Sequence, residues 1–485
     1  HQIDLFLKYP NEVQNELLMN LLLISKDTEI GELYDFKSIH NYRDFSQRIP
    51  VSSYEDYQGL IERSRKGEKN IFWPKPIKWF AKSSGTTNAK SKFIPVSLDS
   101  LEDCHYAAGK DLLCMYLNNN ENSTLFNGKN LRLGGSNELY EENGTIFGDL
   151  SAILIHNMPF WAELSSTPSN KVSLMSDWEY KMQAIVNETI NENVTSLAGV
   201  PSWMLVLLNN VLETSGNKTI LDVWPNLEVY FHGGVSFLPY VDQFKSIIPS
   251  KSVKYYEIYN ASEGFFAIQD RNKSDELLLM LDYGIFYEFI PMNTYGTQTE
   301  KIIPLSDVEK GENYAIIVTT NAGLWRYKIG DTVTFTSTNP YRIKVTGRTK
   351  HFINVFGEEL IIENTDKAVK IATKKTRSEI VDYTVAPIFM EGKSKGGHEW
   401  VIEFKTPPKD LHYFVELLDN SLKSLNSDYE AKRYNNITLN TPKIHVAQRG
   451  LFYKWMKRNN KLGGQHKVPR LSNSRQFLEE LLEMN

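Results

Sequence analysis

Apolar residues recur at helical spacing through most of the first 120 positions. Residues 17–24 carry a strong apolar stripe, and residues 54–65 follow a Pro-Val-Ser-Ser sequence that is typical of a helix N-terminus. The stretch from 97 to 118 has the same period, with His105 among its apolar positions. These patterns predict packing helices, and they make His105 a core residue rather than a metal ligand.

The pattern changes to alternation on both sides of one polar loop. Ile77, Trp79 and Ala81 alternate before the loop, and apolar residues return at 93–96, which predicts a strand, a tight turn and a strand. The loop itself, residues 82–92, holds several hydroxyl side chains, one glycine and three lysines. Hydroxyls, backbone N–H groups and lysine can surround phosphate oxygens, and glycine allows a close approach of the backbone. The loop is not a Walker A sequence, and from the residues alone an exposed hairpin turn is the alternative.

Two later strands end in residues suited to a ligand. An apolar strand that starts near Leu227 stops at Gly233 and Gly234, as expected where a ligand crosses strand ends, although a plain Gly-Gly turn fits the same letters. Alternation from 253 to 259 predicts the next strand, and Glu263 follows its end. A carboxylate there suits Mg²⁺ beside nucleotide phosphates, whereas a lone glutamate at a strand end is more often ordinary surface.

From about residue 351 the pattern shifts to short, mixed helices and strands. The expected helices lie at 364–373, 411–425 and 475–484, and an expected strand lies at 399–404. We therefore expect two domains: a nucleotide- and acyl-binding domain over residues 1–348 and a mobile lid domain over residues 349–485.

Composition narrows the class of protein. The 485 residues are 41% hydrophobic and 23% charged with a net charge of −5, which gives no general attraction to nucleic acid or to an anionic membrane. Cys104 and Cys114 are the only cysteines, and neither an apolar leader nor a membrane-length apolar run occurs, so we expect a reducing, cytoplasmic location without disulfides. Metal motifs of the C-x-x-C and H-E-x-x-H types and the G-x-G-x-x-G dinucleotide fingerprint are absent.

Taken together, these segments resemble the acyl acid amido synthetase family, a branch of the acyl-adenylate-forming superfamily whose plant members join auxin, jasmonate or benzoates to amino acids. The polar loop is similar to the family pattern S-S-G-T-[TS]-x-G-x-x-K-x-[IM]-P and departs from it at Ala89. The matching loop residues are Ser83, Ser84, Gly85, Thr86, Thr87, Lys92, Ile94 and Pro95. Further stretches that resemble family motifs are H-G-G-V-S-F at 232–237, Y-N-A-S-E at 259–263, L-W-R-Y-K-I-G-D at 324–331, G-R at 347–348 and Q-H-K-V-P-R at 465–470.

The resemblance implies a role for most of these residues. The phosphates would be held by Ser83, Ser84, Gly85, Thr86 and Thr87, and the adenine slot would be lined by Gly233, Gly234 and Val235. Adenine and phosphate would be contacted by Tyr259, Asn260, Ala261 and Ser262. Asp331 would bind the ribose hydroxyls, and Arg348 would reach the ribose or the phosphates. Glu263 is expected to hold Mg²⁺ and to act in catalysis with Lys92 and Lys467. Lys467 would stabilise charge on the α-phosphate, although a surface lysine fits the same position almost as well. At Asn260 the family usually has a small residue.

The resemblance also implies the fold and the reaction. The fold would be α/β: a large N-terminal adenylate-forming domain of mixed sheets with a β-barrel-like part, flanked by helices, and a smaller hinged α+β C-terminal domain. The substrates would be ATP with Mg²⁺, a carboxylic acid and an amino acid, which react through an acyl-AMP to give an amide. Acyl-CoA ligation is an alternative, and so is a module that binds a nucleotide or acyl-adenylate without turnover, in view of Ala89 and Asn260. The sequence identifies neither the acid, the amine nor the oligomeric state.

Overall fold

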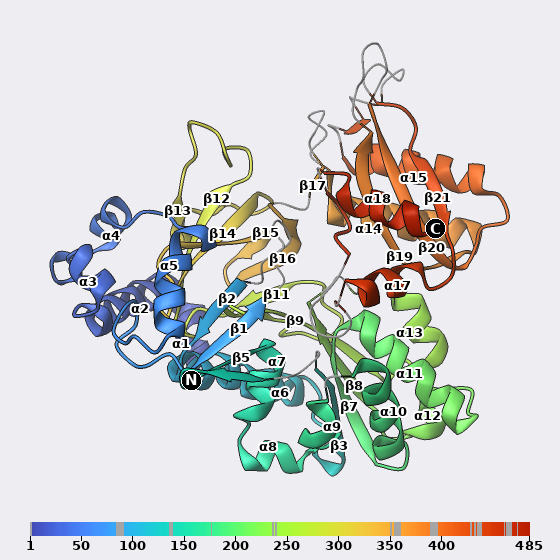
Figure 1. The fold of residues 1–485 in the computed structure, drawn as a ribbon, viewed down its shortest axis with the longest axis horizontal. Coiled ribbons are helices and arrows are strands. Elements are labelled where there is room, and N and C mark those ends of the chain that lie inside the picture. The colour runs from blue at the N-terminus through green and yellow to red at the C-terminus, as the bar shows by residue number, and fades with distance from the viewer. Residues whose placement is uncertain are drawn as a thin grey trace.

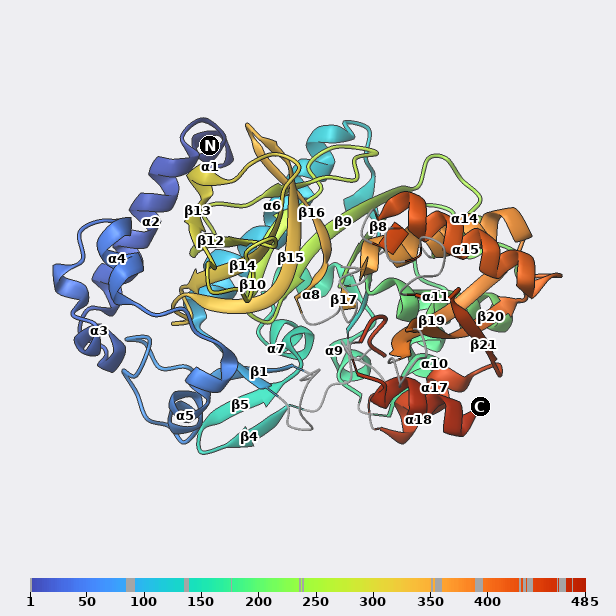
Figure 2. The same ribbon diagram turned by 90° about the horizontal axis from the view of Figure 1, so that it is seen from above.

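A computed structural model shows a large unit, which ends at Thr349, and a small unit, which starts at Phe352 (Figures 1 and 2). The described residues are 2–83, 92–134, 139–175, 177–234, 237, 240–349, 352–353, 360–388, 396–426, 429–430, 433, 439–459, 461, 468–472 and 474–485.

Helices open the chain, as the sequence predicted. They are α1 (Gln2–Lys8), α2 (Pro10–Ser25), α3 (Glu29–Leu33), α4 (Tyr42–Arg48) and α5 (Tyr54–Arg65). The predicted N-terminus of α5 is confirmed, since the Asp56 carboxylate accepts the Ser53 N–H at 2.7 Å. Gln14 ties α2 to the sheet behind it: its side-chain amide donates to the carbonyls of Leu281 and Ile285 at 2.7 and 2.9 Å.

The centre of the large unit is a long sheet, in which the described residues form 12 strands. Across the sheet they are β13 (Ile303–Pro304), β12 (Ile285–Pro291), β14 (Asn313–Thr320), β15 (Tyr327–Thr338), β16 (Tyr341–Arg348), β11 (Leu277–Leu279), β10 (Gly264–Ile268), β9 (Lys254–Ala261), β8 (Val229–Gly233), β7 (Val194–Gly199), β3 (Lys129–Leu133) and β6 (Ser166–Thr167). From β9 to β6 the neighbours are parallel, and from β13 to β9 they are antiparallel. The carboxyl ends of the parallel strands therefore share one edge, which is where such sheets bind ligands.

Helices cover both faces of the parallel strands. One face packs on α10 (Trp178–Thr189), α11 (Pro201–Ser215) and α13 (Val241–Ile247), where Tyr230 and Phe244 lie in one apolar cluster. The other face packs on α6 (Ala107–Asn119), where Phe231 and Tyr116 belong to a larger cluster. Burial of each such side chain contributes about 1.5–3 kcal/mol, so these two layers fix the sheet edge in place. Further helices are α7 (Leu150–His156), α8 (Phe160–Leu164), α9 (Asn170–Ser173) and α12 (Ile220–Val223).

The polar loop joins two strands of a second sheet, as predicted. This sheet consists, among the described residues, of β2 (Lys92–Val96), β1 (Trp79–Ser83), β5 (Thr145–Gly148) and β4 (Tyr140–Glu142). β1 and β2 are antiparallel, and Ser83 lies opposite Lys92, so the loop connects two paired residues of a hairpin.

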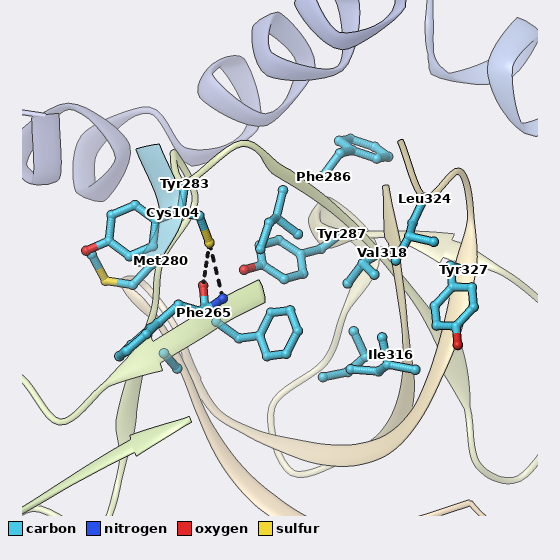
Figure 3. Close-up of a cluster of buried hydrophobic side chains, with 14 of the residues drawn as sticks. Cys104, Phe265, Met280, Tyr283, Phe286, Tyr287, Ile316, Val318, Leu324 and Tyr327 are labelled. Carbon is cyan, nitrogen blue, oxygen red and sulfur yellow. Dashed lines mark hydrogen bonds between the residues drawn. The ribbon is translucent and has the colours of Figure 1, made fainter. Parts of the chain in front are cut away.

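The helix predicted at 97–118 has two parts. Its first part, Ser100–Tyr106, is a π-helix, and α6 follows it. In the π-helix, the Cys104 sulfur accepts the Phe265 N–H at 3.2 Å (Figure 3). His105 is buried, as predicted, and burial lowers its pKa to about 4. Because Phe265 comes two residues after Glu263, the cysteine contact helps to fix the turn that carries this glutamate.

The small unit is built on a sheet whose described order is β19 (Glu379–Ile388), β20 (Gly397–Thr406) and β21 (Lys443–Ala447). α14 (Ile362–Thr376) and α15 (Leu411–Leu425) cover one face, and α17 (Leu451–Arg458) and α18 (Gln476–Met484) cover the other. A short pair, β17 (Phe352–Ile353) and β18 (Leu360–Ile361), precedes α14. The predicted helices and the predicted strand after residue 351 are confirmed.

No helix among the described residues combines the length and apolarity that crossing a membrane requires. Both cysteines are free: Cys104 is buried and Cys114 is exposed.

Candidate active site

The carboxyl ends of β8 and β9 bring the predicted residues to one edge. β8 stops at Gly233, which pairs with Ile258 of β9. A Cβ at Gly233 would lie 2.5 Å from the Ile258 carbonyl oxygen, so a larger residue would push the two strands apart. Gly234 has a φ of 77°, a backbone conformation that favours glycine. The backbone thus favours glycine at both positions, and neither position adds a side chain of its own to the strand end, as a flat ligand slot needs.

Tyr259, Asp331 and Arg348 come from three strands and meet in one hydrogen-bonded group. The Tyr259 hydroxyl donates to Asp331 Oδ2 at 2.8 Å, and Arg348 Nε donates to Asp331 Oδ1 at 2.5 Å. Asp331 and Arg348 are cross-strand partners on β15 and β16, and Tyr259 stands near the end of β9. The Asp331 charge raises the pKa of Arg348, so the guanidinium keeps its proton.

Glu263 lies in the turn between β9 and β10, within electrostatic reach of that group. Burial raises the pKa of its carboxyl to about 7; Arg348 and Lys92 oppose this rise, and Asp331 adds to it. The neighbouring charges therefore compensate the carboxylate only in part, which suits a carboxylate that binds a cation. Among the described residues, no group of three or more His, Cys, Asp or Glu side chains could hold a metal ion. A metal ion at Glu263 would take its other ligands from phosphate oxygens and water.

The remaining described residues of the 259–263 motif line the same strand end. Asn260 and Ala261 are half-buried and complete β9, and Ser262 is buried in the turn. The three residues therefore accompany Tyr259 and Glu263 to the edge, as the sequence predicted.

Lys92 begins β2 at the root of the polar loop. Its ammonium group lies 5.3 Å from the centre of the Tyr54 ring, and the Tyr54 hydroxyl accepts the Phe93 N–H at 2.9 Å. The Lys92 charge opposes the rise in the pKa of the Glu263 carboxyl, so the start of β2 and the β9–β10 turn lie within electrostatic range of each other. Several predicted site residues lie outside the described residues: Ser84, Gly85, Thr86, Thr87, Val235 and Lys467. Of Ser83 the backbone is described, as the last residue of β1.

Asp149 and Lys181 lie near the base of the loop and were not predicted. Asp149 follows Gly148, which pairs with Ala81 of β1. Burial raises the pKa of Asp149 to about 7, with Lys82 and Lys181 opposing, and burial lowers the pKa of Lys181 to about 8, with Asp149 opposing. Nothing in the sequence marks these residues, because a lysine on an amphipathic helix is ordinarily exposed and only the packing of α10 buries Lys181.

Arg326 shares a motif with Asp331 but does not face the edge. Its guanidinium forms a bidentate ion pair with the Glu288 carboxylate, in which both N–O distances are 2.8 Å. The guanidinium also donates to the backbone carbonyl oxygens of Ser46 and Ile49. The side chains of Arg326 and Glu288 are 4% and 1% exposed. Arg326 is therefore a structural residue that joins the N-terminal helices to the sheet.

The arrangement has the fold of adenylate-forming enzymes. The structure matches that of GH3.15 acyl acid amido synthetase with a TM-score of 0.81, at 18% sequence identity, over 98% of this chain and 93% of that one. It also matches 2-hydroxyisobutyryl-CoA ligase in the postadenylation state in complex with R3-HIB-AMP, with a TM-score of 0.62, at 13% identity, over 97% of this chain and 90% of that one. The predicted α/β fold class, with a large N-terminal and a smaller C-terminal part, is confirmed.

Within this fold class, the chain belongs to the GH3 family. Models of the GH3 family N-terminal, central and C-terminal domains match residues 1–253, 278–348 and 363–476. The jasmonoyl–L-amino acid synthetase JAR6 of Nicotiana attenuata is 23% identical over 546 aligned residues, which cover 96% of this chain and 91% of that protein. The family resemblance seen in the sequence motifs is thereby confirmed.

Proposed function

We propose that this chain is an acyl acid amido synthetase, a ligase that joins a carboxylic acid to the amine of an amino acid at the expense of ATP. In the first half-reaction an oxygen of the acid attacks the α-phosphorus of ATP; the bond to pyrophosphate breaks, and acyl-AMP forms. In the second, the amine attacks the acyl carbon; AMP leaves, a proton is released and an amide forms.

The observation that carries the proposal is the meeting of Tyr259, Glu263, Asp331 and Arg348 at one sheet edge of a GH3-family chain. These residues come from three stretches of sequence, and Asp331 is near enough to Glu263 for its charge to raise the pKa of the Glu263 carboxyl. A nucleotide offers each of them a partner: ribose hydroxyls for Asp331, and a phosphate-bound cation for Glu263.

In this proposal each residue orients or neutralises part of the substrates. Asp331 accepts hydrogen bonds from the ribose hydroxyls, Arg348 supports Asp331, and Tyr259 with Gly233 and Gly234 bounds the adenine. Glu263 would hold Mg²⁺, which would supply positive charge beside the phosphates during adenylation. Lys92, Lys467 and the loop from Ser83 to Thr87 contribute further positive charge and hydrogen-bond donors. Since the obstacle to the first step is repulsion between anions, such fixed charges lower the barrier without a covalent nucleophile.

We further propose that residues 1–348 form the substrate-binding domain and residues 349–485 a mobile lid, and that the protein is cytoplasmic. The two parts have separate apolar cores: clusters around Tyr383 and Trp455 belong to the small unit, and the sheet clusters belong to the large unit. Both cysteines are free, which suits a reducing compartment.

The test is carboxylate-dependent exchange of labelled pyrophosphate into ATP by the purified chain, screened over aryl and alkyl carboxylic acids. We expect exchange with at least one acid, and an amide product detected by mass spectrometry when a set of amino acids is then added. A CoA thioester formed in place of an amide would make the protein an acyl-CoA ligase. Tight binding of ATP without exchange or product, for every acid tried, would instead make it a binding module.

A further inference from the structure

The small unit contacts the large unit at a short stretch just beyond the glycine pair. Arg470 Nη2 donates to the Tyr240 hydroxyl at 3.1 Å, and Gln243 Nε2 donates to the Ile380 carbonyl at 2.9 Å. The stretch that includes Tyr240 and Gln243 begins six residues after Gly234, which ends the proposed adenine slot. The contacts that orient the small unit thus lie close in sequence to the glycines that end the proposed adenine slot.

Apolar contacts support the same stretch. Tyr453 and Met456 of α17 pack against the cluster that contains Tyr240 and Phe244, and α17 lies next to α13 in Figure 1. These contacts are non-directional, and side chains of this kind can slide over one another. The hydrogen bond from Arg470 to Tyr240 is directional, so it can select one orientation of the small unit.

Arg470 is held firmly on its own side of the contact. Its Nη1 lies 2.6 Å from Asp366 Oδ1, its Nε lies 3.9 Å from Asp382 Oδ1, and its guanidinium carbon lies 5.1 Å from the centre of the Tyr383 ring. The Arg470 side chain is 11% exposed and that of Asp366 is 2% exposed. Two carboxylates and a ring hold the guanidinium in place within the small unit. Its hydrogen bond to Tyr240 therefore restricts how the whole small unit can be oriented relative to the large unit.

The backbone around Arg470 is fixed as well. The Val385 N–H donates to the Arg470 carbonyl at 2.8 Å, the Thr384 hydroxyl donates to the Pro469 carbonyl at 2.6 Å, and the Ser472 N–H donates to the Val385 carbonyl at 3.1 Å. Residues 469–472 therefore move with β19. Lys467, the proposed catalytic lysine of the small unit, precedes Arg470 by three residues in the sequence.

We propose that Arg470 is a positioning residue whose hydrogen bond to Tyr240 holds the small unit in the orientation that serves adenylation. The inference rests on the proposed function, because it assigns the contact to one of its two half-reactions. Arg470 touches neither substrate; it acts through the placement of the unit that carries Lys467.

The first test is Tyr240→Phe, which removes the acceptor hydroxyl and keeps the ring. We expect kcat for pyrophosphate exchange to fall about tenfold, the effect of one hydrogen bond to a charged group, with KM for ATP and the melting temperature nearly unchanged. The rate of amide formation from isolated acyl-AMP should stay within about twofold. An equal loss in both half-reactions, or no loss in either, would overturn the proposal.

A double-variant cycle separates positioning from a general structural role. If Tyr240 acts through the lysine, Tyr240→Phe should slow exchange no further in a Lys467→Ala background; penalties that multiply would contradict the proposal. Tyr429→Phe is the matched control, since it removes a buried tyrosine hydroxyl that donates to Asp419 at 2.8 Å within the small unit. It should leave the ratio of the two half-reactions unchanged.

A measurement without turnover distinguishes failure of this inference from failure of the proposed function. Spin labels at Asn217→Cys and Lys409→Cys, both exposed positions, in a Cys114→Ser background report the distance between the units. Tyr240→Phe should broaden the distance distribution relative to the unaltered chain and to Tyr429→Phe. An unchanged distribution would overturn the inference even if the enzyme is active. A broadened one would support the positioning contact between Arg470 and Tyr240 by itself, and its assignment to adenylation then stands or falls with the exchange measurements.

Discussion

Two arginine–carboxylate pairs in the large unit show how differently the same chemistry can be used. The side chains of Arg326 and Glu288 are 4% and 1% exposed, and each has hydrogen-bond partners besides the other. The Tyr42 hydroxyl donates to Glu288 at 2.9 Å, and the backbone carbonyls of Ser46 and Ile49 accept hydrogen bonds from Arg326. Arg348 and Asp331 are 42% and 10% exposed and share one N–O contact.

The difference separates a structural pair from a ligand-binding pair. The Arg326 pair is closed, so its removal would leave a charge buried within the core. The Arg348 pair is partly open, and beside it Glu263 bears a charge that its neighbours compensate only in part. The Asp331–Arg348 pair is therefore open enough to accept a ligand as a further partner, whereas the Glu288–Arg326 pair is too buried to do so.

The largest effect is expected at the closed pair. Arg326→Met would leave the buried Glu288 carboxylate without its ion-pair partner, and we expect the free energy of unfolding to fall by about 3–5 kcal/mol. Urea denaturation followed by circular dichroism measures it. Arg63→Met is the matched control, since Arg63 pairs with Glu29 on the surface, where solvent screens the pair, and its loss should change stability far less. Equal stability of the two variants would remove the distinction between the pairs.

The next effect is expected at Asp331. Asp331→Ala removes both proposed hydrogen bonds to the ribose, so ATP affinity measured by calorimetry should fall about 100-fold. The fold should tolerate the change better than Arg326→Met, because the side chain of Arg348 is 42% exposed and can be solvated. Unchanged ATP affinity would refute the ribose assignment.

A smaller effect is expected at Glu263. Glu263→Gln preserves shape and removes the charge, so pyrophosphate exchange at saturating ATP should slow about 10- to 30-fold, while ATP binding without Mg²⁺ changes little. A variant that exchanges at the normal rate would show that the metal ion lies elsewhere.

The smallest effect is a dependence on pH. The raised pKa of Glu263, about 7, means that the carboxyl is largely protonated below pH 7, where a proton competes with Mg²⁺. The apparent affinity for Mg²⁺ in the exchange reaction should therefore rise by up to about tenfold from pH 6 to pH 8. Glu263→Gln should flatten this dependence, and a flat profile in the unaltered chain would contradict the assignment.

Part of this arrangement could be predicted because the motifs around Gly233 and Tyr259 sit at the ends of strands whose apolar pattern is visible in the sequence. The motifs predict that Tyr259, Glu263 and Asp331 contact a nucleotide, and these roles stay predictions. Alternation on both sides of the polar loop predicts the pairing of β1 with β2, which is confirmed. The pairing of Asp331 with Arg348 follows from the register of β15 and β16, which the sequence does not specify.

Other features depend on contacts between distant parts of the chain. Arg326 and Glu288 are 38 residues apart in the sequence, and Arg470 and Tyr240 are 230 apart. In neither case do the residues next to one partner indicate which residue the other partner is. The π-helix at Ser100–Tyr106 has the same apolar period as an ordinary helix and was expected as one. Local sequence patterns thus predict helices, strands and their ends, whereas only the folded structure shows which charged side chains pair with each other.

The capping of α17 has a mechanical consequence. The Glu403 carboxylate, on the central strand of the small sheet, accepts the Gly450 and Phe452 N–H groups at 2.6 and 3.2 Å, so the start of this helix is clamped to β20. The start of α17 therefore cannot turn independently of β20. If residues 349–485 move as the proposed lid, α17 moves together with its sheet, and all of its contacts with the large unit break in one step.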